Sequence, residues 1–216
     1  MAREIDGLDE ADRYAAACRG SANPVALAWL AESLVLGEAS AVVDLGAGLG
    51  GPAAWLQARY GCRVVALEPA PCAAVAAEAL FGLAVVRAHA GAVPLRSGAF
   101  DSALLLGVLS VVRDSPGVLD EAARLASTLG VLDYCATGPC TVEAGGSHFL
   151  PAAALLATLT DAGWSVDQTS TVPVDPPQRW SDARSWEDLA EHEDERAVAF
   201  AIRDGSIAAF MAVAHR

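Results

Sequence analysis

The stretch that decides the fold runs from Val42 to Pro52 and reads VVDLGAGLGGP. A short apolar run, typical of a buried strand, meets an acid, Asp44, and then enters a cluster of glycines. Glycine lets the backbone turn sharply and lie close to a ligand. A helix-like stretch, 53–60, follows, and the free N–H groups at the start of a helix point at whatever occupies such a turn. The stretch therefore predicts a strand, a ligand-binding turn and a helix.

A second apolar run, 63–67, is followed by Glu68, which lies twenty residues after Gly48. In open α/β sheets, a glycine turn combined with an acid at the end of the next strand holds a nucleoside. The backbone passes beneath the sugar, and the carboxylate accepts hydrogen bonds from the ribose hydroxyls. We therefore expect a nucleoside-containing ligand with Glu68 on its ribose.

The composition indicates one densely packed domain. The chain has 216 residues, of which 54% are hydrophobic, enough for a single α/β domain with a sizeable core. We expect 1–216 to form one domain, with N-terminal helices in 1–40 covering part of the ligand and 41–216 forming the core.

No apolar run approaches the ~20 residues that a membrane span requires, and residues 1–20 are too charged for a secretory signal. A cytoplasmic location is therefore the expectation.

The charged and sulfur-containing residues narrow the function classes. A net charge of −13 argues against nucleic acid as a substrate, because binding a phosphate backbone requires clustered positive charge. Lysine is absent, so a lysine Schiff base cannot form. The five cysteines include no Cys-x-x-Cys pair, and we expect reduced, mostly buried thiols and no metal site. The expected partner is a small molecule.

Apolar runs alternate with helical patterns along most of the chain. Several runs, such as 103–108, are continuously apolar, as is typical of strands buried on both faces of a parallel sheet. The prediction is an α/β fold: a Rossmann-like, doubly wound, mostly parallel seven-stranded sheet with helices on both faces and an antiparallel last strand. The expected strands are 41–45, 63–67, 83–87, 101–107, 130–135, 164–172 and 207–214. The expected helices are 8–19, 24–36, 52–60, 71–81, 116–127, 151–162 and about 186–203.

Two segments near the C-terminus are less regular. Residues 145–148, which read GGSH, are expected to form a loop, as is the proline-rich segment 173–181. Residues 197–203 fit a helix or a strand, because Asp-Gly at 204–205 between two apolar runs is also a hairpin signal. The acids in 187–195 favour the helix, since negative charge stabilises a helix N-terminus.

The spacing Gly46-x-Gly48-x-x-Gly51 also matches the dinucleotide-binding pattern, with Glu68 at the position of an NAD-binding acid. An NAD-dependent oxidoreductase is therefore an alternative. Asp44 counts against it, because a carboxylate beside the turn would repel a pyrophosphate and would favour a cationic group. We also expect no second domain to hold a hydride acceptor, and the segments further along the chain fit another family better.

That family is the class I S-adenosylmethionine-dependent methyltransferases, which the chain resembles in an ordered set of motifs between about residues 40 and 166. The first motif is the glycine stretch described above, and Glu68-Pro69 resembles the ribose-binding acid of the family and its neighbour. The ending Gly-Gly-Pro-Ala is similar to that of small-molecule methyltransferases. The other matching segments are 93–101 (VPLRSGAFD), 106–109 (LGVL), 121–125 (EAARL), 130–133 (GVLD) and 162–164 (AGW).

The resemblance implies S-adenosylmethionine as the cofactor, held by residues at the ends of strands. Gly46, Ala47 and Gly48 are expected beneath its methionine and ribose. Glu68 is expected at the ribose, and Pro69, His89 and Ala90 at the adenine. Gly107 and Val108 are expected at the methionine chain, and Asp44 either orients the turn or faces the amino group through water. Tyr14 and Arg19 are candidates for the cofactor carboxylate.

Two departures from the family pattern affect this site. The family commonly has Asp-Ala where this chain has His89-Ala90, and a neutral histidine cannot reproduce a carboxylate that accepts a hydrogen bond from the adenine amino group. Many relatives carry a histidine after the fourth strand, where this chain reads LSVV at 109–112. A base at that position is therefore missing.

The acceptor side is less specific. Methyl transfer from a sulfonium is a direct displacement that needs good positioning, no metal, and a base only where the acceptor is protonated. His148 and Tyr134 are the candidate catalytic residues, with His148 as the candidate base. Other candidates in the loops at this edge of the sheet are Cys135, Phe149 and Trp180, and 173–186 is a candidate lid.

The sequence thus predicts transfer of a methyl group from S-adenosylmethionine to N, O or C of a small molecule. The alternative is a protein that binds S-adenosylmethionine but catalyses a cyclisation or decarboxylation, or serves as a partner subunit. His89 and the missing family histidine motivate this alternative. A homo-oligomer is compatible with the sequence, which leaves the oligomeric state open.

Overall fold

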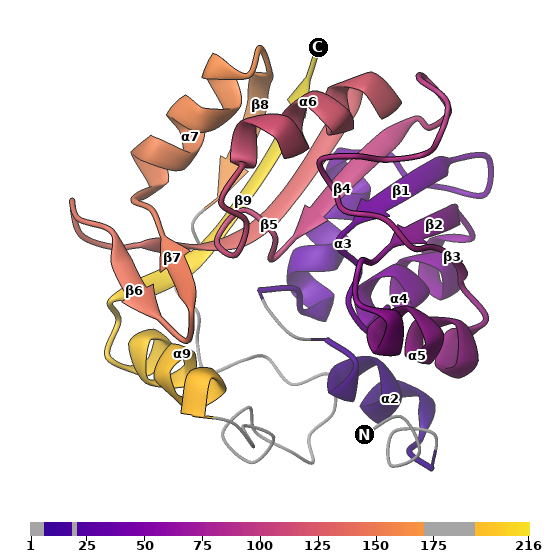
Figure 1. The fold of residues 1–216 in the computed structure, drawn as a ribbon, viewed down its shortest axis with the longest axis horizontal. Helices are drawn as coiled ribbons and strands as arrows, with labels where there is room; N and C mark the ends of the chain where they lie inside the picture. The colour runs from indigo at the N-terminus through magenta and orange to yellow at the C-terminus, as the bar shows by residue number, and fades with distance from the viewer. Residues whose placement is uncertain (1–6, 19–20, 171–192) are drawn as a thin grey trace.

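The computed structural model describes residues 7–18, 21–170 and 193–216 (Figure 1). Its centre is a seven-stranded sheet in the order β3-β2-β1-β4-β5-β9-β8. Strands β1 to β5 pair in parallel, whereas β9 is antiparallel to both β5 and β8. The strands are β1 (Ala41–Leu45), β2 (Arg63–Leu67), β3 (Ala84–Val86), β4 (Ser102–Leu106), β5 (Thr128–Ala136), β8 (Ser165–Ser170) and β9 (Ile207–His215). The predicted sheet, with its antiparallel last strand, is confirmed.

Helices cover both faces of the sheet, as predicted (Figure 1). Helices α3, α4 and α5 share one apolar cluster with one face, and α6 and α7 share a second cluster with the other. The helices are α2 (Glu10–Ala16), α3 (Pro24–Ser33), α4 (Gly51–Tyr60), α5 (Pro71–Phe81), α6 (Ser115–Leu125), α7 (Ala152–Asp161) and α9 (Glu193–Arg203). In the described ranges, none of these helices has the length and apolar character that a membrane crossing requires.

Strand β1 shows how the sequence produces these two layers. Successive side chains of a strand point to opposite faces of the sheet. Val42 therefore packs in the cluster with α3 and α4, whereas Val43 and Leu45 pack in the cluster with α6 and α7, and all three are fully buried. Asp44 points to the same side as Val42. One charged side chain thus lies in an otherwise apolar central strand, just before the glycine turn.

The ends of helix α3 depend on local chemistry. Asn23 caps its start, since the Asn23 side chain accepts the N–H of Ala26 at 2.9 Å and Pro24 occupies the first helical position. The helix ends at Ser33, before the predicted limit of 36, because Val35 has a left-handed backbone with a φ of 55°. Predicted helix 8–19 is likewise shorter, as α2.

Residues 145–148 were expected to form a loop, and this expectation is wrong. They form the turn and part of a β-hairpin, β6 (Val142–Ala144) and β7 (Ser147–Phe149). Gly145 and Gly146 both have positive φ, 57° and 74°, which a two-residue hairpin turn requires. Strands of three residues are too short for an alternating pattern to be recognised in the sequence.

Residues 197–203, which fitted a helix or a strand, are helical. They belong to α9, whose Ala201 and Ile202 pack in a small apolar cluster with Tyr134, Phe149 and Ile207. The expected first part of this helix, 186–192, lies outside the described residues. The Asp-Gly pair at 204–205 is the turn between α9 and β9.

Candidate functional site

The glycine turn lies at the end of β1 and is attached to the neighbouring strand β2. The N–H groups of Gly46 and Ala47 both donate to the carbonyl of Leu67, at 2.9 and 2.8 Å. Gly46 and Gly48 have φ values of 89° and 58°, in the left-handed region that favours glycine. The turn therefore passes over the end of the sheet and leads directly into α4.

Glu68 lies beside this turn, as the sequence predicts. One of its carboxylate oxygens accepts the N–H of Gly48 at 2.9 Å, and the other accepts the N–H of Ala70 at 2.8 Å. The side chain is buried. A carboxylate has about four acceptor positions, so these two hydrogen bonds orient Glu68 and leave capacity for ligand hydroxyls.

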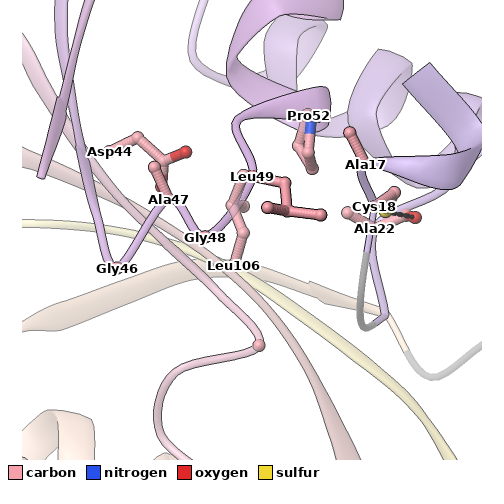
Figure 2. Close-up of a pocket in the computed structure, with 11 residues that line it drawn as sticks. Ala17, Cys18, Ala22, Asp44, Gly46, Ala47, Gly48, Leu49, Pro52 and Leu106 are labelled. Atoms are coloured by element: carbon pink, nitrogen blue, oxygen red, sulfur yellow. Dashed lines mark hydrogen bonds between the residues drawn. The ribbon is translucent and has the colours of Figure 1, made fainter. Parts of the chain in front are cut away.

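A pocket opens next to the turn, at the carboxyl end of β1 and β4 (Figure 2). An ideal Cβ placed on Gly48 would meet no atom within 4 Å, so the space above this residue is open. The pocket is lined by Ala17, Cys18, Ala22, Asp44, Gly46, Ala47, Gly48, Leu49, Pro52, Leu106 and Gly107. Five of the expected cofactor-binding residues, Asp44, Gly46, Ala47, Gly48 and Gly107, thus line one cavity.

Among the described residues of this lining, Asp44 is the one acidic or basic side chain. It is 1% exposed, and neither of its carboxylate oxygens has a hydrogen-bond partner. Burial, together with the negative charge of Glu68, raises the pKa of Asp44 to about 7. A buried carboxyl without a donor is costly unless a ligand supplies one. The pocket is therefore suited to a cationic hydrogen-bond donor at Asp44.

Val108 lies directly beneath the turn. A Cβ on Gly46 would come within 2.9 Å of the Val108 side chain, which is itself 4% exposed in the core. Val108 therefore supports the turn and is not among the pocket-lining residues, whereas its neighbour Gly107 is. The N–H of Gly107 donates to the carbonyl of Leu132 at 2.7 Å and fixes the end of β4 against β5.

Pro69, His89 and Ala90 lie outside the pocket lining. Pro69 and His89 are exposed, and Ala90 is half-buried against the core. These residues follow β2 and β3, the two strands on the far side of β1 from the pocket, so they could meet only a ligand that extends past Glu68.

Tyr14 contacts Glu10 in its own helix, α2, and Phe81 at the end of α5. Its hydroxyl donates to Glu10 at 2.7 Å, and its ring stacks on Phe81 with centroids 5.6 Å apart. Its expected partner at the cofactor carboxylate, Arg19, lies outside the described residues. The segment that follows Tyr14 nevertheless forms a pocket wall, since Ala17 and Cys18 line the cavity.

Sequence reasoning missed six of the lining residues: Ala17, Cys18, Ala22, Leu49, Pro52 and Leu106. Ala17 and Cys18 reach the pocket because α2 packs closely on α4, and the carbonyl of Ala22 accepts a hydrogen bond from the Cys18 thiol at 2.8 Å. A Cβ on Gly51 would lie 2.6 Å from the Tyr14 carbonyl oxygen and 2.9 Å from the Ala17 carbonyl carbon. Gly51 could have indicated this contact in the sequence, because a glycine at the start of a helix lets another segment of backbone approach closely.

The candidate base His148 lies on β7, and its strand is tied to the loop that follows β4. The N–H of His148 donates to the carbonyl of Ser110 at 2.8 Å, and the N–H of Ser110 donates to Asp133 at 3.1 Å. The fold thus brings His148 beside residues 109–112, where the sequence lacks the family histidine. His148 is half-buried.

The second catalytic candidate, Tyr134, lies at the end of β5 and is 6% exposed. Its ring packs edge-on against Phe149, with centroids 6.1 Å apart. Burial raises the pKa of Tyr134 well above its usual value, with smaller contributions from Cys18 and Asp133. Tyr134 is therefore suited to donating a hydrogen bond and not to ionising.

Trp180 and the candidate lid 173–186 lie outside the described residues.

Comparison with known proteins agrees with this geometry. Residues 43–132 match a family model described as a methyltransferase domain. The matched segment covers less than half of the chain and includes the glycine turn and Glu68, so it agrees with the predicted resemblance to a methyltransferase. A search of curated proteins found no match.

Solved structures with the same fold include enzymes of different chemistry. The (4+2)-cyclase SpnF has a TM-score of 0.72 and 20% identity, over 88% of this chain and 80% of the other. Geranyl diphosphate C-methyltransferase from Streptomyces coelicolor A3(2), crystallised with S-adenosyl-L-homocysteine, has a TM-score of 0.71 and 18% identity, over 88% and 74%. Cyclopropane synthase MmaA2 from Mycobacterium tuberculosis has a TM-score of 0.68 and 12% identity, over 98% and 95%. At these identities the likeness establishes the fold.

Proposed function

We propose that this protein transfers a methyl group from S-adenosylmethionine to N, O or C of a small molecule by direct displacement. The observation that carries the proposal is the pocket beside the glycine turn, in which a buried carboxylate, Asp44, has no partner of its own. The methyltransferase-domain match over 43–132 supports it.

The pocket and the neighbouring Glu68 suit the methionine and ribose parts of the cofactor. Asp44 offers a negative charge to the methionine ammonium, which would supply the donors that this carboxyl lacks. Glu68, held by the N–H of Gly48, offers its remaining acceptor positions to the ribose hydroxyls. The open space above Gly48 lets the ligand approach the backbone. S-adenosylmethionine supplies a methyl group already activated on a sulfonium, so the protein contributes mainly position.

His89 and Ala90 are proposed at the adenine, beyond Glu68 on the β3 side of the turn. Pro69 belongs to the same group, since it follows β2, whereas His89 and Ala90 follow β3, the neighbour of β2 in the sheet. Tyr14 and Arg19 are proposed at the cofactor carboxylate, with the Tyr14 hydroxyl exchanging its present acceptor, Glu10, for that group. These assignments need a ligand that continues from the pocket in both directions along the edge of the sheet.

On the acceptor side we propose His148 as the base and Tyr134 as a hydrogen-bond donor. The hydrogen bond from His148 to Ser110 supports this assignment, because it places β7 beside the loop that leaves Gly107 and the pocket. We propose a small molecule as the acceptor. The protein's net charge of −13 disfavours a nucleic acid.

Cofactor binding tests the proposal directly. Isothermal titration calorimetry with S-adenosylhomocysteine should show one site, and Glu68→Ala should weaken binding at least tenfold, because it removes the acceptor for the ribose hydroxyls and frees the turn. A matched control is Glu143→Ala, since Glu143 lies on the exposed strand β6 and should leave the affinity unchanged. No binding of either cofactor form at millimolar concentration would refute the proposal.

The alternative function is a reaction without methylation, such as a cyclisation, or a role as a partner subunit. Two observations favour this alternative function: the structural likeness to the cyclase SpnF, and the exposed His89 in place of the family acid. Mass spectrometry of the product decides between the two functions. Methyl transfer adds about 14 Da, a methyl group in place of a hydrogen, whereas turnover without a gain in mass supports the alternative.

A further inference from the structure

Asp44 differs from the other buried carboxylates that the structure describes. Glu68 accepts two backbone N–H groups, and Asp133 accepts N–H groups from Ser110 and from Tyr134. Asp44 is equally buried and accepts none, although it forms part of the pocket wall (Figure 2). A buried carboxyl in that situation is more stable with its proton than without it.

The surroundings of Asp44 reinforce this preference. Its register partners on β2 and β4 are the apolar residues Ala66 and Leu104, and the end of β2 adds the negative charge of Glu68. Among the described residues that line the pocket, Cys18 is the other titratable group, and none is a cation. Arg19 lies outside the described residues. Burial and Glu68 together raise the pKa of Asp44 to about 7.

We propose that the empty pocket holds Asp44 as a carboxylic acid near neutral pH, and that a nucleoside bearing an amino-acid ammonium binds by displacing this proton. The inference rests on the proposed function, since it assumes that the pocket accepts S-adenosylmethionine and its product. The exchange is balanced: the carboxyl O–H releases its proton to solvent, and the resulting carboxylate pairs with the intact ammonium group. No other bond is made or broken.

The consequence is discrimination between nucleosides by charge. Only a ligand that brings a positive charge to Asp44 compensates the buried carboxylate. A ligand with the same adenosine but no amino acid, such as 5′-methylthioadenosine, leaves the proton in place. Asp44 thus acts as a specificity-determining residue that couples the binding of the amino-acid part to proton release.

The experiment is calorimetry with S-adenosylhomocysteine in pairs of buffers with different ionisation enthalpies, which reports the number of protons released. With the pKa of Asp44 at about 7, binding should release about 0.9 proton from this carboxyl at pH 6.0 and close to none from it at pH 8.5. The dissociation constant should increase roughly tenfold per pH unit below pH 7, and it should level off above pH 7 up to the pH at which the ligand's own ammonium group loses its proton. Binding of 5′-methylthioadenosine should release no proton from this group at either pH.

Variants assign the proton to Asp44. Asp44→Asn should abolish the release at pH 6.0, whereas Asp167→Asn, which removes an exposed carboxylate paired with His215, should leave it unchanged. Glu68→Gln should move the midpoint of the pH dependence to lower pH, because it removes the negative charge that favours the protonated form.

The outcomes separate this inference from the proposed function. S-adenosylhomocysteine that binds with no proton release at pH 6.0, or that releases as many protons as 5′-methylthioadenosine does, overturns the inference and leaves the proposed function standing. Failure to bind S-adenosylhomocysteine at any pH overturns both. The wild-type measurements with the two ligands suffice where a variant does not fold.

Discussion

At the residue scale, two carboxylates at the ends of adjacent strands differ in whether the backbone donates hydrogen bonds to them. Glu68 follows β2 and is satisfied by the backbone of the glycine turn, so it is held ready for neutral hydroxyl groups. Asp44 precedes the turn within β1 and has no hydrogen-bond partner, because the N–H groups of the turn donate to Leu67 and Glu68 instead. The difference arises because the turn donates its hydrogen bonds to β2 and offers none to β1.

Gly48 provides a prediction at this scale. Gly48→Ala should lower the free energy of unfolding by about 1 kcal/mol, the cost of a left-handed backbone for an L-residue, because its φ is 58° and the new methyl group meets no protein atom. The methyl group would instead occupy space in the pocket, so the affinity for S-adenosylhomocysteine should fall by about tenfold or more, equal to about 1.4 kcal/mol.

Gly82→Ala is the matched control for this change. Gly82 follows α5, has a φ of 64° and also has open space at its Cβ position, but it is not among the pocket-lining residues. Denaturant unfolding should show a similar loss for both variants, and calorimetry should show weakened binding for Gly48→Ala alone. Equal affinities for the two variants would contradict the placement of the ligand above Gly48.

At the element scale, the helices and strands mostly follow their local signals, and the exceptions have local causes. Helix α5 spans 71–81 as predicted, from a proline in its first turn to a glycine just after its end. Strand β5 extends over Thr128–Ala136, beyond the predicted 130–135, because all nine of its residues pair with β9. Helix α3 ends early, at Ser33, just before Val35, a β-branched residue in a left-handed conformation that usually requires glycine.

Val35 leads to the prediction at this scale. Its side chain is 84% exposed, so Val35→Gly loses little packing and relieves backbone strain. We expect the free energy of unfolding to increase by about 1 kcal/mol, which corresponds to a rise in Tm of about 2–4 °C for a domain of this size. Thermal unfolding followed by circular dichroism measures the change.

The same substitution within a regular helix should act in the opposite direction. Val75 lies inside α5 and is 62% exposed. Val75→Gly should therefore lower the stability by about 0.5 kcal/mol through helix propensity alone. A decrease in Tm for Val35→Gly, comparable to that for Val75→Gly, would show that position 35 is not strained.

At the scale of the whole molecule, Asp133 connects three parts of the chain on the acceptor side. It lies at the end of β5, is fully buried, and accepts the N–H of Ser110 from the loop after β4. The carbonyl of Ser110 in turn accepts the N–H of His148 from the β6–β7 hairpin. Burial raises the pKa of Asp133, and its hydrogen bonds oppose that rise. One side chain thus holds a loop and a hairpin in register with the central sheet.

Asp133→Asn tests this connection. An amide group replaces one acceptor by a donor, which faces the donors already present, so the free energy of unfolding should fall by about 2 kcal/mol. Native-state hydrogen exchange should show faster exchange at the amides of Ser110 and His148, while amides in β1 and β2 change only as far as global stability does.

Asp204→Asn is the control for Asp133→Asn. Asp204 is an exposed residue that accepts the N–H of Ser206 in the turn before β9, so its replacement should leave both amides protected. Unchanged exchange at Ser110 and His148 in Asp133→Asn would show that the loop and the hairpin are held independently of this carboxylate.

Much of the fold and of the cofactor side of the site could be predicted from the sequence, because the signals are local. The glycine stretch, the acid twenty residues beyond it and the apolar runs each lie within a few residues of one strand end. The hairpin at 142–149, the pocket wall formed by Ala17 and Cys18, and the link from Asp133 to His148 could not be predicted. Each of these depends on segments that are distant in the chain and carry weak patterns of their own.

The sequence by itself determined where along the chain the strands of the central sheet lie, the position of the glycine turn and the placement of Glu68 at the end of the next strand. Alternating apolar runs and glycines impose these features on the backbone wherever the rest of the chain lies. Only the tertiary structure decided that Asp44 is left without a hydrogen-bond donor and that His148 lies beside the loop after β4. Burial and the choice of hydrogen-bond partner are properties of the packed molecule, because they depend on which atoms from other elements reach a given side chain.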